Sequence, residues 1–207
     1  MRLTKYGHAC VRLDLAGGSV VLDPGTYTPD VDLDGVVDVL VTHEHPDHLD
    51  LDRLAPFVRD GGRVHTNSDV AASLAADHGL EVHAVRPGET FTVAGVDVQV
   101  VGGAHAEIYN GLPGCANVGF VLADVYHPGD ALYLPDVDVG TLLVPVSAPW
   151  LKLCEALDFV RAVRPARAFP IHDALLSDIG SGGVDRWMVN EGGTDYRRLA
   201  PGESTDL

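Results

Sequence analysis

The sequence predicts an α/β fold, a four-layer αβ/βα sandwich in which two β-sheets pack face to face and helices cover their outer faces. The chain of 207 residues opens with short strands in hairpins and continues with strands that alternate with helices, and this succession occurs twice. Two such halves can bury their apolar sheet faces against each other. Because no residue-level repeat and no linker divides the chain, we expect one domain over residues 1–207.

The first half of the chain is expected to form five strands and two helices. Residues 11–15 alternate apolar and charged side chains, the period of a half-buried strand, whereas residues 36–42 are almost continuously apolar, as in a strand covered on both faces. Asn67 or Ser68 would cap the second helix and Gly79 would end it. The expected strands are residues 3–6, 9–15, 19–22, 36–42 and 63–66, and the expected helices are residues 47–57 and 67–78.

The second half is expected to form six strands and a strong helix. Ala94-Gly95 provides a hairpin turn, and a Pro-Gly turn at residues 128–129 separates two of the strands. The expected strands are residues 90–93, 96–101, 118–123, 131–134, 141–146 and 166–171, and the expected helix is residues 151–163. Residues 173–207 would form a weak helix followed by a polar tail.

The composition excludes several classes of partner. The net charge is −16 and the 14 Lys and Arg residues are scattered, so a nucleic-acid polymer or an anionic membrane is not expected to bind. No apolar run approaches a membrane span, no signal peptide is visible, and three widely spaced cysteines are typical of reduced thiols. We therefore expect a cytoplasmic protein that acts on a small molecule. A homo-oligomer is left open.

The strongest motif is the hexapeptide His-Glu-His-Pro-Asp-His, which holds four potential metal ligands directly after an apolar strand. In an extended segment His43 and His45 point to the same face, so both imidazoles can reach one metal, and Pro46 favours that backbone. The chain then turns, which lets Asp47 and His48 face a second metal. A site for one structural metal is the alternative, but such zinc sites usually contain cysteine. Histidine and carboxylate ligands suit zinc, manganese or iron.

The pattern His43-x-His45-x-Asp47-His48 resembles the signature of the metallo-β-lactamase-fold hydrolases. Within that superfamily the chain is similar to small bacterial hydrolases related to the L-ascorbate-6-phosphate lactonases. The other segments that carry the resemblance are Tyr6-Gly7-His8-Ala9-Cys10, residues 20–25, Tyr126-His127-Pro128-Gly129-Asp130, Arg164-Pro165 and Pro170-Ile171-His172. Together they extend over most of the chain.

The resemblance implies a two-metal site with ligands from distant segments. The implied set is His43, His45 and His105 for the first metal, Asp47, His48 and His172 for the second, and Asp130 as the bridge. Asp124 is the alternative to Asp130, but Gly129 favours a tight turn that presents the Asp130 carboxylate. His105 has the alternative of a solvated loop residue.

The implied cofactors are two divalent metal ions, zinc in the first place, with manganese or iron as alternatives. Metals at such a spacing lower the pKa of a bridging water, and the hydroxide attacks a small ester, lactone or phosphoester. Asp47 would be the catalytic residue, because in the family it binds metal and orients the nucleophile. No serine or cysteine nucleophile is required.

Other residues near these motifs have two interpretations each. His8 could support the metal ligands or face the substrate, and Asp23 could accept a hydrogen bond from a ligand histidine or be a plain turn residue. Lys152 could meet an anion or begin a helix. Substrate contacts are expected from residues 26–27, 109–110 and 147–152, or these are simply solvated. The remaining histidines, His65, His78, His83 and His127, are interpreted as ordinary.

Three rival functions remain at this point. The first is a phosphodiesterase, with a cyclic nucleotide as its substrate, since the acidic balance argues only against polymers. The second is a non-catalytic sensor that keeps the fold and the metal. The third is an oxygen-reactive iron enzyme.

Overall fold

The computed structural model describes residues 1–207 and has two seven-stranded sheets and four helices. In spatial order the first sheet contains β14 (Ser204–Asp206), β1 (Arg2–Gly7), β2 (Cys10–Leu15), β3 (Gly18–Leu22), β4 (Val36–Val41), β5 (Arg63–Asn67) and β6 (His83–Val85). The second contains β13 (Asp195–Tyr196), β12 (Arg167–Ile171), β11 (Thr141–Pro145), β10 (Val125–His127), β9 (Val118–Leu122), β8 (Val96–Gly102) and β7 (Thr90–Val93). The helices are α1 (Leu51–Arg59), α2 (Ser68–His78), α3 (Leu153–Val163) and α4 (Asp178–Glu191).

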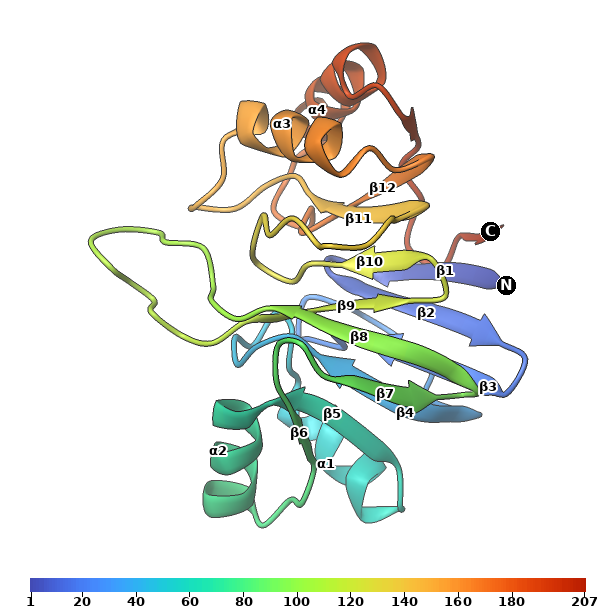
Figure 1. The fold of residues 1–207 in the computed structure, drawn as a ribbon, viewed down its shortest axis with the longest axis vertical. Coiled ribbons are helices and arrows are strands. Elements are labelled where there is room, and N and C mark those ends of the chain that lie inside the picture. Colours follow the sequence, from blue (N-terminus) through green and yellow to red (C-terminus); the bar gives the residue numbers. More distant parts are fainter.

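The buried side chains divide into three apolar layers that separate the four layers of backbone. Along β4, Leu40 belongs to the core between the sheets, whereas Val39 and Val41 belong to the cluster under α1 and α2. Along β11, Leu143 points into the central core and Leu142 packs with α3 on the other side. Figure 1 shows α1 and α2 on one outer face and α3 and α4 on the other. The predicted four-layer sandwich is confirmed.

The two middle helices begin and end as their residues dictate. The Asn67 side chain accepts hydrogen bonds from two backbone amides of the first turn, and Gly79 ends α2 with a φ of 63°, as the sequence predicts. The helix expected from residue 47 begins instead at Leu51, capped by Asp50. The preceding residues are irregular because His45 turns the chain, its carbonyl accepting from the amides of the third and fourth residues after it.

Two predictions about the second half are wrong. Residues 131–134 are not a strand; β10 lies earlier, and it joins β9 through Ala123 and Asp124, whose φ angles are 47° and 69°. Two consecutive left-handed residues make the tight hairpin turn that suits twisted antiparallel strands. The polar tail contributes β13 and β14 to the sheet edges, and strands of two and three residues are too short to show a hydrophobic period.

The loops that carry the candidate ligands lie at one edge of the sandwich. β3, β4 and β5 are parallel in one sheet, and β10, β11 and β12 are parallel in the other, so each set ends at a single edge. Hydrogen bonds join the two edges: Val118 N–H donates to Thr42 O at 3.0 Å, and His172 N–H donates to His8 O at 3.1 Å. None of the helices is long and apolar enough to cross a membrane.

Candidate metal centre

All seven predicted ligands meet at this edge, each in a loop that follows a strand. His43, His45, Asp47 and His48 follow β4, His105 follows β8, Asp130 follows β10 and His172 follows β12. Five of the seven are buried, and the side chains of His45 and Asp47 are partly exposed. The structure therefore places donors from both sheets around a common centre whose partly exposed members face solvent.

The first donor group contains His43, His45, His105 and Asp130, whose candidate ligand atoms all lie within 4.8 Å of one another. His43 Nε2 and His45 Nδ1 are 3.0 Å apart, and His105 Nε2 is 3.3 Å from an Asp130 oxygen. The predicted convergence of His43 and His45 on one point occurs, although the segment that holds them is irregular and not part of a strand.

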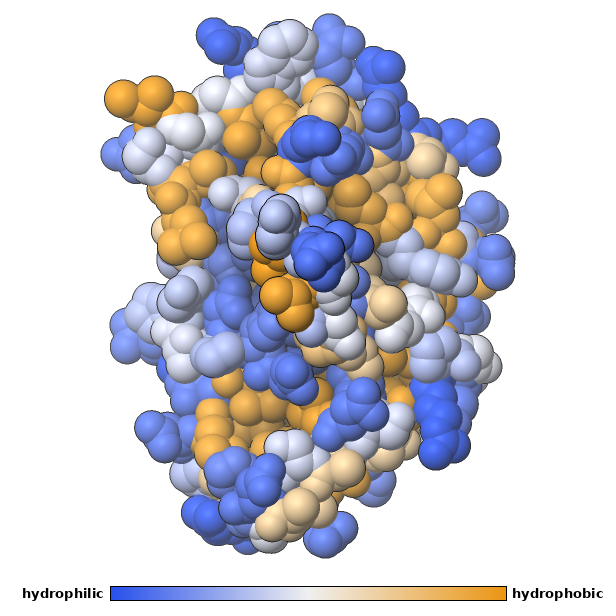
Figure 2. All heavy atoms as spheres, turned by 90° about the vertical axis from the view of Figure 1, so that its left-hand side faces the viewer, coloured by the Kyte–Doolittle hydropathy of each residue, from blue (hydrophilic) through white to orange (hydrophobic).

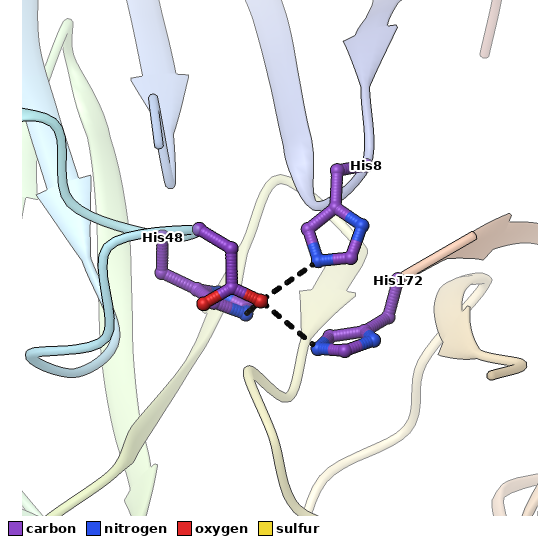
Figure 3. Close-up of side chains that lie close together, drawn as sticks. His8, His48 and His172 are labelled. Carbon is purple, nitrogen blue, oxygen red and sulfur yellow. Dashed lines mark hydrogen bonds and ion pairs between the residues drawn. The ribbon is translucent and has the colours of Figure 1, made fainter. Parts of the chain in front are cut away.

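The second donor group contains Asp47, His48 and His172, joined by His8, again within 4.8 Å. Asp47 Oδ2 lies 3.5 Å from His172 Nε2 and 3.9 Å from His48 Nε2. Figure 3 shows His8, His48 and His172 close together on chain segments that arrive from different parts of the fold. The dashed lines from His8 and His172 end on a carboxylate oxygen, and these contacts are the ones that both residues make with Asp47 Oδ2. Asp47 Oδ2, which faces His48 and His172, is also the oxygen that His8 contacts.

Asp130 lies between the two groups. Its Oδ1 is 3.1 Å from His48 Nε2, while its Oδ2 is 3.0 Å from His172 Nε2 and 3.3 Å from His105 Nε2. Its backbone is fixed because Asn117 Oδ1 accepts from the Asp130 amide at 3.0 Å. A Cβ on Gly129 would lie 2.3 Å from that same Asn117 oxygen, so the residue before Asp130 has to be glycine. One carboxylate thus contacts histidines of both groups.

The outward nitrogens of three histidines are anchored by hydrogen bonds. His48 Nδ1 lies 2.7 Å from Asp23 Oδ2, His105 Nδ1 lies 2.6 Å from the Ala106 carbonyl, and His172 Nδ1 lies 2.5 Å from the Ser147 carbonyl. Because a carbonyl or carboxylate oxygen can only accept, these Nδ1 atoms carry hydrogen and leave Nε2 facing the centre. This arrangement is common for histidines that bind a metal through Nε2.

The inward atoms lack hydrogen-bond partners. His48 Nε2, His105 Nε2, His172 Nε2 and Asp130 Oδ1 are fully buried and, despite their short separations, make no hydrogen bond of good geometry. Unpaired buried polar atoms are costly and rare, so a cluster of four requires a partner that the side chains themselves do not supply. Convergent imidazole nitrogens with carboxylate oxygens are suitable donors for zinc, manganese or iron. The residues fit divalent metal ions.

The electrostatics of the protein without metal point the same way. Burial disfavours the charged form of His172, but the close carboxylates of Asp130 and Asp47 outweigh burial and raise its pKa to about 9. The pKa of His48 is likewise raised well above its usual value, because Asp130 and Asp23 outweigh burial. Burial opposes the charge on Asp130, yet His48, His105 and His172 hold its pKa well below the usual range. In the metal-free protein, the positive charges of protonated His48 and His172 therefore compensate the negative charge of the carboxylates, a role that bound cations would take over.

Several residues outside the predicted ligand set support it. Asp23 is fully buried and accepts from Thr42 N–H and Oγ1–H as well as from His48, so it takes the hydrogen-bonding role and not that of a plain turn residue. Trp150 Nε1–H donates to Asp130 Oδ2 at 3.1 Å. The sequence predicts substrate contacts or solvated positions for residues 147–152, and not this contact with a candidate ligand. His127 is satisfied on both ring nitrogens, by the Gly129 amide and the Ala9 carbonyl, and is a structural residue.

Aromatic side chains, and not cations, lie beside the donors. The Tyr27 ring is 5.2 Å from the His8 ring, and the Trp150 ring is 6.1 Å from His105 and 6.2 Å from His172. Lys152 pairs with Glu155 at the start of α3, and no Lys or Arg makes an ion pair with either carboxylate of the donor groups. On the face from which the β8–β9 loop projects, exposed apolar residues accompany the hydrophilic ones (Figure 2). In the β8–β9 loop the exposed apolar residues include Ile108 and Leu112.

Two sheets packed face to face, with histidines and carboxylates gathered at one edge, define a metal-binding α/β protein. Residues 2–172 match the family model of the β-lactamase superfamily domain, and the chain belongs to this superfamily. It is 36% identical to protein Rv0786c of Mycobacterium tuberculosis over 99% of this chain and 98% of that one. It is 29% identical to a UPF0173 metal-dependent hydrolase of Methanocaldococcus jannaschii, over 82% of this chain and 83% of the relative.

The solved structures agree on the fold. Igni18, a metallo hydrolase from Ignicoccus hospitalis, superposes with a TM-score of 0.78 over 99% of this chain and 97% of its own, at 19% sequence identity. The metallo-β-lactamase fold is thus confirmed, and with the family match the protein is a metal-dependent hydrolase of the β-lactamase superfamily. The particular relation to L-ascorbate-6-phosphate lactonases stays a prediction.

Proposed function

We propose that this protein is a dinuclear metal-dependent hydrolase that cleaves a small ester or lactone. The observation that carries the proposal is the pair of donor groups that share Asp130, with four buried polar atoms that lack hydrogen-bond partners. One metal would be held by His43, His45 and His105. The other would be held by Asp47, His48 and His172, and Asp130 would be a ligand of both. Divalent metals in such a site supply an activated water and polarise the oxygen under attack.

Asp47 is the residue we propose as the proton acceptor. Its contacts with His8, His48 and His172 all involve Oδ2, so Oδ1 is left for a proton. The side chain is 20% exposed, which lets it reach a substrate, whereas the Asp130 side chain is only 4% exposed and contacts three histidines. Burial opposes the charge on Asp47, but its close contacts with His172 and His8 outweigh burial and hold its pKa well below the usual value. Asp47 is therefore ionised at neutral pH, the form in which a carboxylate can bind a metal.

A carboxylic ester or lactone is favoured over a phosphoester within this proposal. Proteins that bind phosphate often use Arg and Lys beside any metal, because these side chains form charge-assisted hydrogen bonds with the phosphate oxygens. Here the side chains beside the donors are the rings of Tyr27 and Trp150, and the carboxylates pair only with histidines. The formal net charge of −16 also disfavours a multiply charged anion.

The test begins with the metal-free protein reconstituted with zinc, manganese or iron. We expect elemental analysis to approach two metals per chain, and we expect hydrolysis of p-nitrophenyl acetate and dihydrocoumarin to exceed that of bis-p-nitrophenyl phosphate and cyclic AMP. Asp130→Ala and His45→Ala should each lower metal content and abolish hydrolysis while circular dichroism stays unchanged. His78→Ala, at an exposed position at the end of α2, is the matched control.

Three outcomes would contradict the proposal. Full activity in Asp130→Ala or His45→Ala would show that the substituted residue is not an essential metal ligand and would contradict the assigned ligand set. Two bound metals without hydrolysis of any compound would favour a metal-binding sensor. Preference for the phosphodiesters would favour the phosphodiesterase alternative.

A further inference from the structure

His8 lies at the tip of the β1–β2 hairpin, buried beside the second donor group. It is 2% exposed, and its φ of 43° is a left-handed conformation uncommon for a histidine. Its Nε2 lies within 4.8 Å of the candidate ligand atoms of Asp47, His48 and His172. By distance alone His8 could therefore be a further metal ligand.

The direction of its hydrogen bonds indicates a different role. The backbone N–H of Ala174 donates to His8 Nδ1 at 3.3 Å, so Nδ1 carries no hydrogen. In the neutral ring the hydrogen then sits on Nε2, which donates to Asp47 Oδ2 at 3.0 Å. A neutral histidine binds a metal through the nitrogen that lacks hydrogen. That nitrogen, Nδ1, is already occupied by the main chain.

The ligand histidines of the same centre have the opposite arrangement. In His48, His105 and His172 the Nδ1–H points outward to an oxygen acceptor, so in the neutral ring, the form that binds a metal, Nε2 faces inward without hydrogen. His8 faces the centre with a donor where the others face it with an acceptor. Since the difference is set by a backbone amide, which cannot reverse its role, it is built into the fold.

We infer that His8 is a positioning residue that holds Asp47 by an Nε2–H···Oδ2 hydrogen bond, and is not a metal ligand. Its main chain also positions the second group, because the His8 carbonyl accepts from the His172 amide at 3.1 Å. Asp47 needs such support, since its side chain is 20% exposed and the contact from His8 Nε2 is the side-chain hydrogen bond of good geometry that its Oδ2 accepts. This inference deepens the proposed function and rests on Asp47 serving as a ligand and proton acceptor.

Two amide variants separate the two hydrogen bonds of the His8 ring. In His8→Gln the amide nitrogen reaches about as far as Nε2 and can still donate to Asp47. In His8→Asn the shorter amide reaches only the place of Nδ1, so it can accept from Ala174 but not donate to Asp47. Asparagine tolerates left-handed backbone well, so His8→Asn should fold.

We expect His8→Asn to weaken binding of the second zinc about tenfold to hundredfold, the usual cost of losing a hydrogen bond to a ligand. Binding of the first zinc should be unchanged, kcat should fall while KM holds, and His8→Gln should restore both quantities. If both variants match the parent in zinc affinity and kcat, or if Gln fails to restore what Asn loses, the positioning role is wrong.

Nuclear magnetic resonance tests the inference without reference to activity. Long-range ¹H–¹⁵N spectra should show the Nε2–H tautomer at His8 in the metal-free and the metal-loaded protein. With ¹¹³Cd bound, coupling should appear at Nε2 of His48 and His172 and be absent at His8. Coupling at His8 would make it a ligand and overturn the inference. Absence of any metal binding, with His8 still in the Nε2–H form, would instead contradict the proposed function alone.

Discussion

Trp150 donates its indole N–H to Asp130 Oδ2 at 3.1 Å, so the carboxylate that contacts both donor groups is held from outside by a tryptophan. The same oxygen lies 3.0 Å from His172 Nε2. Any cation that attracts this oxygen also changes the electrostatic environment of the indole. Trp150 is therefore placed to report on the centre as well as to orient it.

Trp150 should provide an intrinsic fluorescence signal for metal binding. The chain has two tryptophans, and Trp187→Phe leaves Trp150 alone. We expect zinc to shift the emission of this variant, and a paramagnetic ion to quench it, with saturation at the stoichiometry found by elemental analysis. In Trp150→Phe the remaining Trp187 is 50% exposed on α4 and should not respond. An equal response from both variants would mean that the indole does not sense the centre.

Gly25→Ala should disrupt the second donor group. A Cβ at this position would lie 2.0 Å from the Asp47 carbonyl carbon and oxygen and 2.4 Å from His48 N, which is closer than atoms can approach. The backbone of Asp47 and His48 has to move, so we expect loss of one metal and of activity, measured by elemental analysis and hydrolysis. The first group does not include these residues and should keep its metal.

Gly182→Ala is the matched control for that substitution. Gly182 lies in α4, and a Cβ there meets nothing within 4 Å. Alanine in a helix interior is favoured over glycine by about 0.5–1 kcal/mol, so the variant should unfold at a higher temperature with unchanged metal content. If Gly25→Ala also keeps both metals, close packing against the Asp47 backbone does not position the second group.

Asp23→Asn should weaken metal binding without removing a ligand. Asp23 Oδ2 accepts from His48 Nδ1 at 2.7 Å and thereby fixes the ring with Nε2 inward. The asparagine amide would present to His48 Nδ1–H either its own N–H group or a neutral oxygen, which is a weaker acceptor than a carboxylate. We therefore expect metal affinity to fall about tenfold to hundredfold, the usual loss for residues that support a metal ligand. Competition with a chelating dye would measure it.

Asp38→Asn provides the comparison for Asp23→Asn. Asp38 is also a fully buried aspartate of the first sheet, but it pairs with Arg63 and His65 and not with a ligand. Its replacement should lower the temperature of unfolding and leave metal affinity unchanged. Equal losses of metal affinity in the two variants would indicate a general effect of destabilising the sheet.

The sequence predicted most of the fold because its strands have a clear period. Residues 11–15 alternate, residues 36–42 are almost continuously apolar, and α2 begins after Asn67 and ends at Gly79 where expected. The turn at Ala123 and Asp124 could not be predicted, since alanine rarely adopts a positive φ and only the pairing of β9 with β10 enforces it. The strands β13 and β14 are set by contacts with sheet edges distant in the sequence.

The convergence of the candidate donor residues was predictable from the sequence, and the residues that support them were not. The hexapeptide after β4 shows its chemistry within one short segment, whereas His105, Asp130 and His172 depended on resemblance. The contacts of His8 with Asp47 and of Trp150 with Asp130 join residues 39 and 20 positions apart. Such contacts arise from the packing of loops, and no local pattern encodes them.

Metal binding should release protons near neutral pH. Burial disfavours the charged form of His172, but Asp130 and Asp47 outweigh it and raise its pKa to about 9, and the pKa of His48 is also raised. A histidine has to be neutral to bind a metal, so below about pH 9 an ion bound by the second donor group displaces protons, and its affinity should increase with pH up to that value. Calorimetry in buffers of different ionisation enthalpy would count the protons released at pH 7.5.

The same shift predicts how the stability of the metal-free protein depends on pH. The pKa of His172 is higher in the folded than in the unfolded chain, so its charged form stabilises the fold fully below about pH 6.5. That contribution is lost as pH rises from 6.5 through about 9, and the temperature of unfolding of the metal-free protein should fall over this range. The zinc-loaded protein should not show the fall. His172→Gln should flatten the profile of the metal-free protein, and an unchanged profile would assign the effect to other groups.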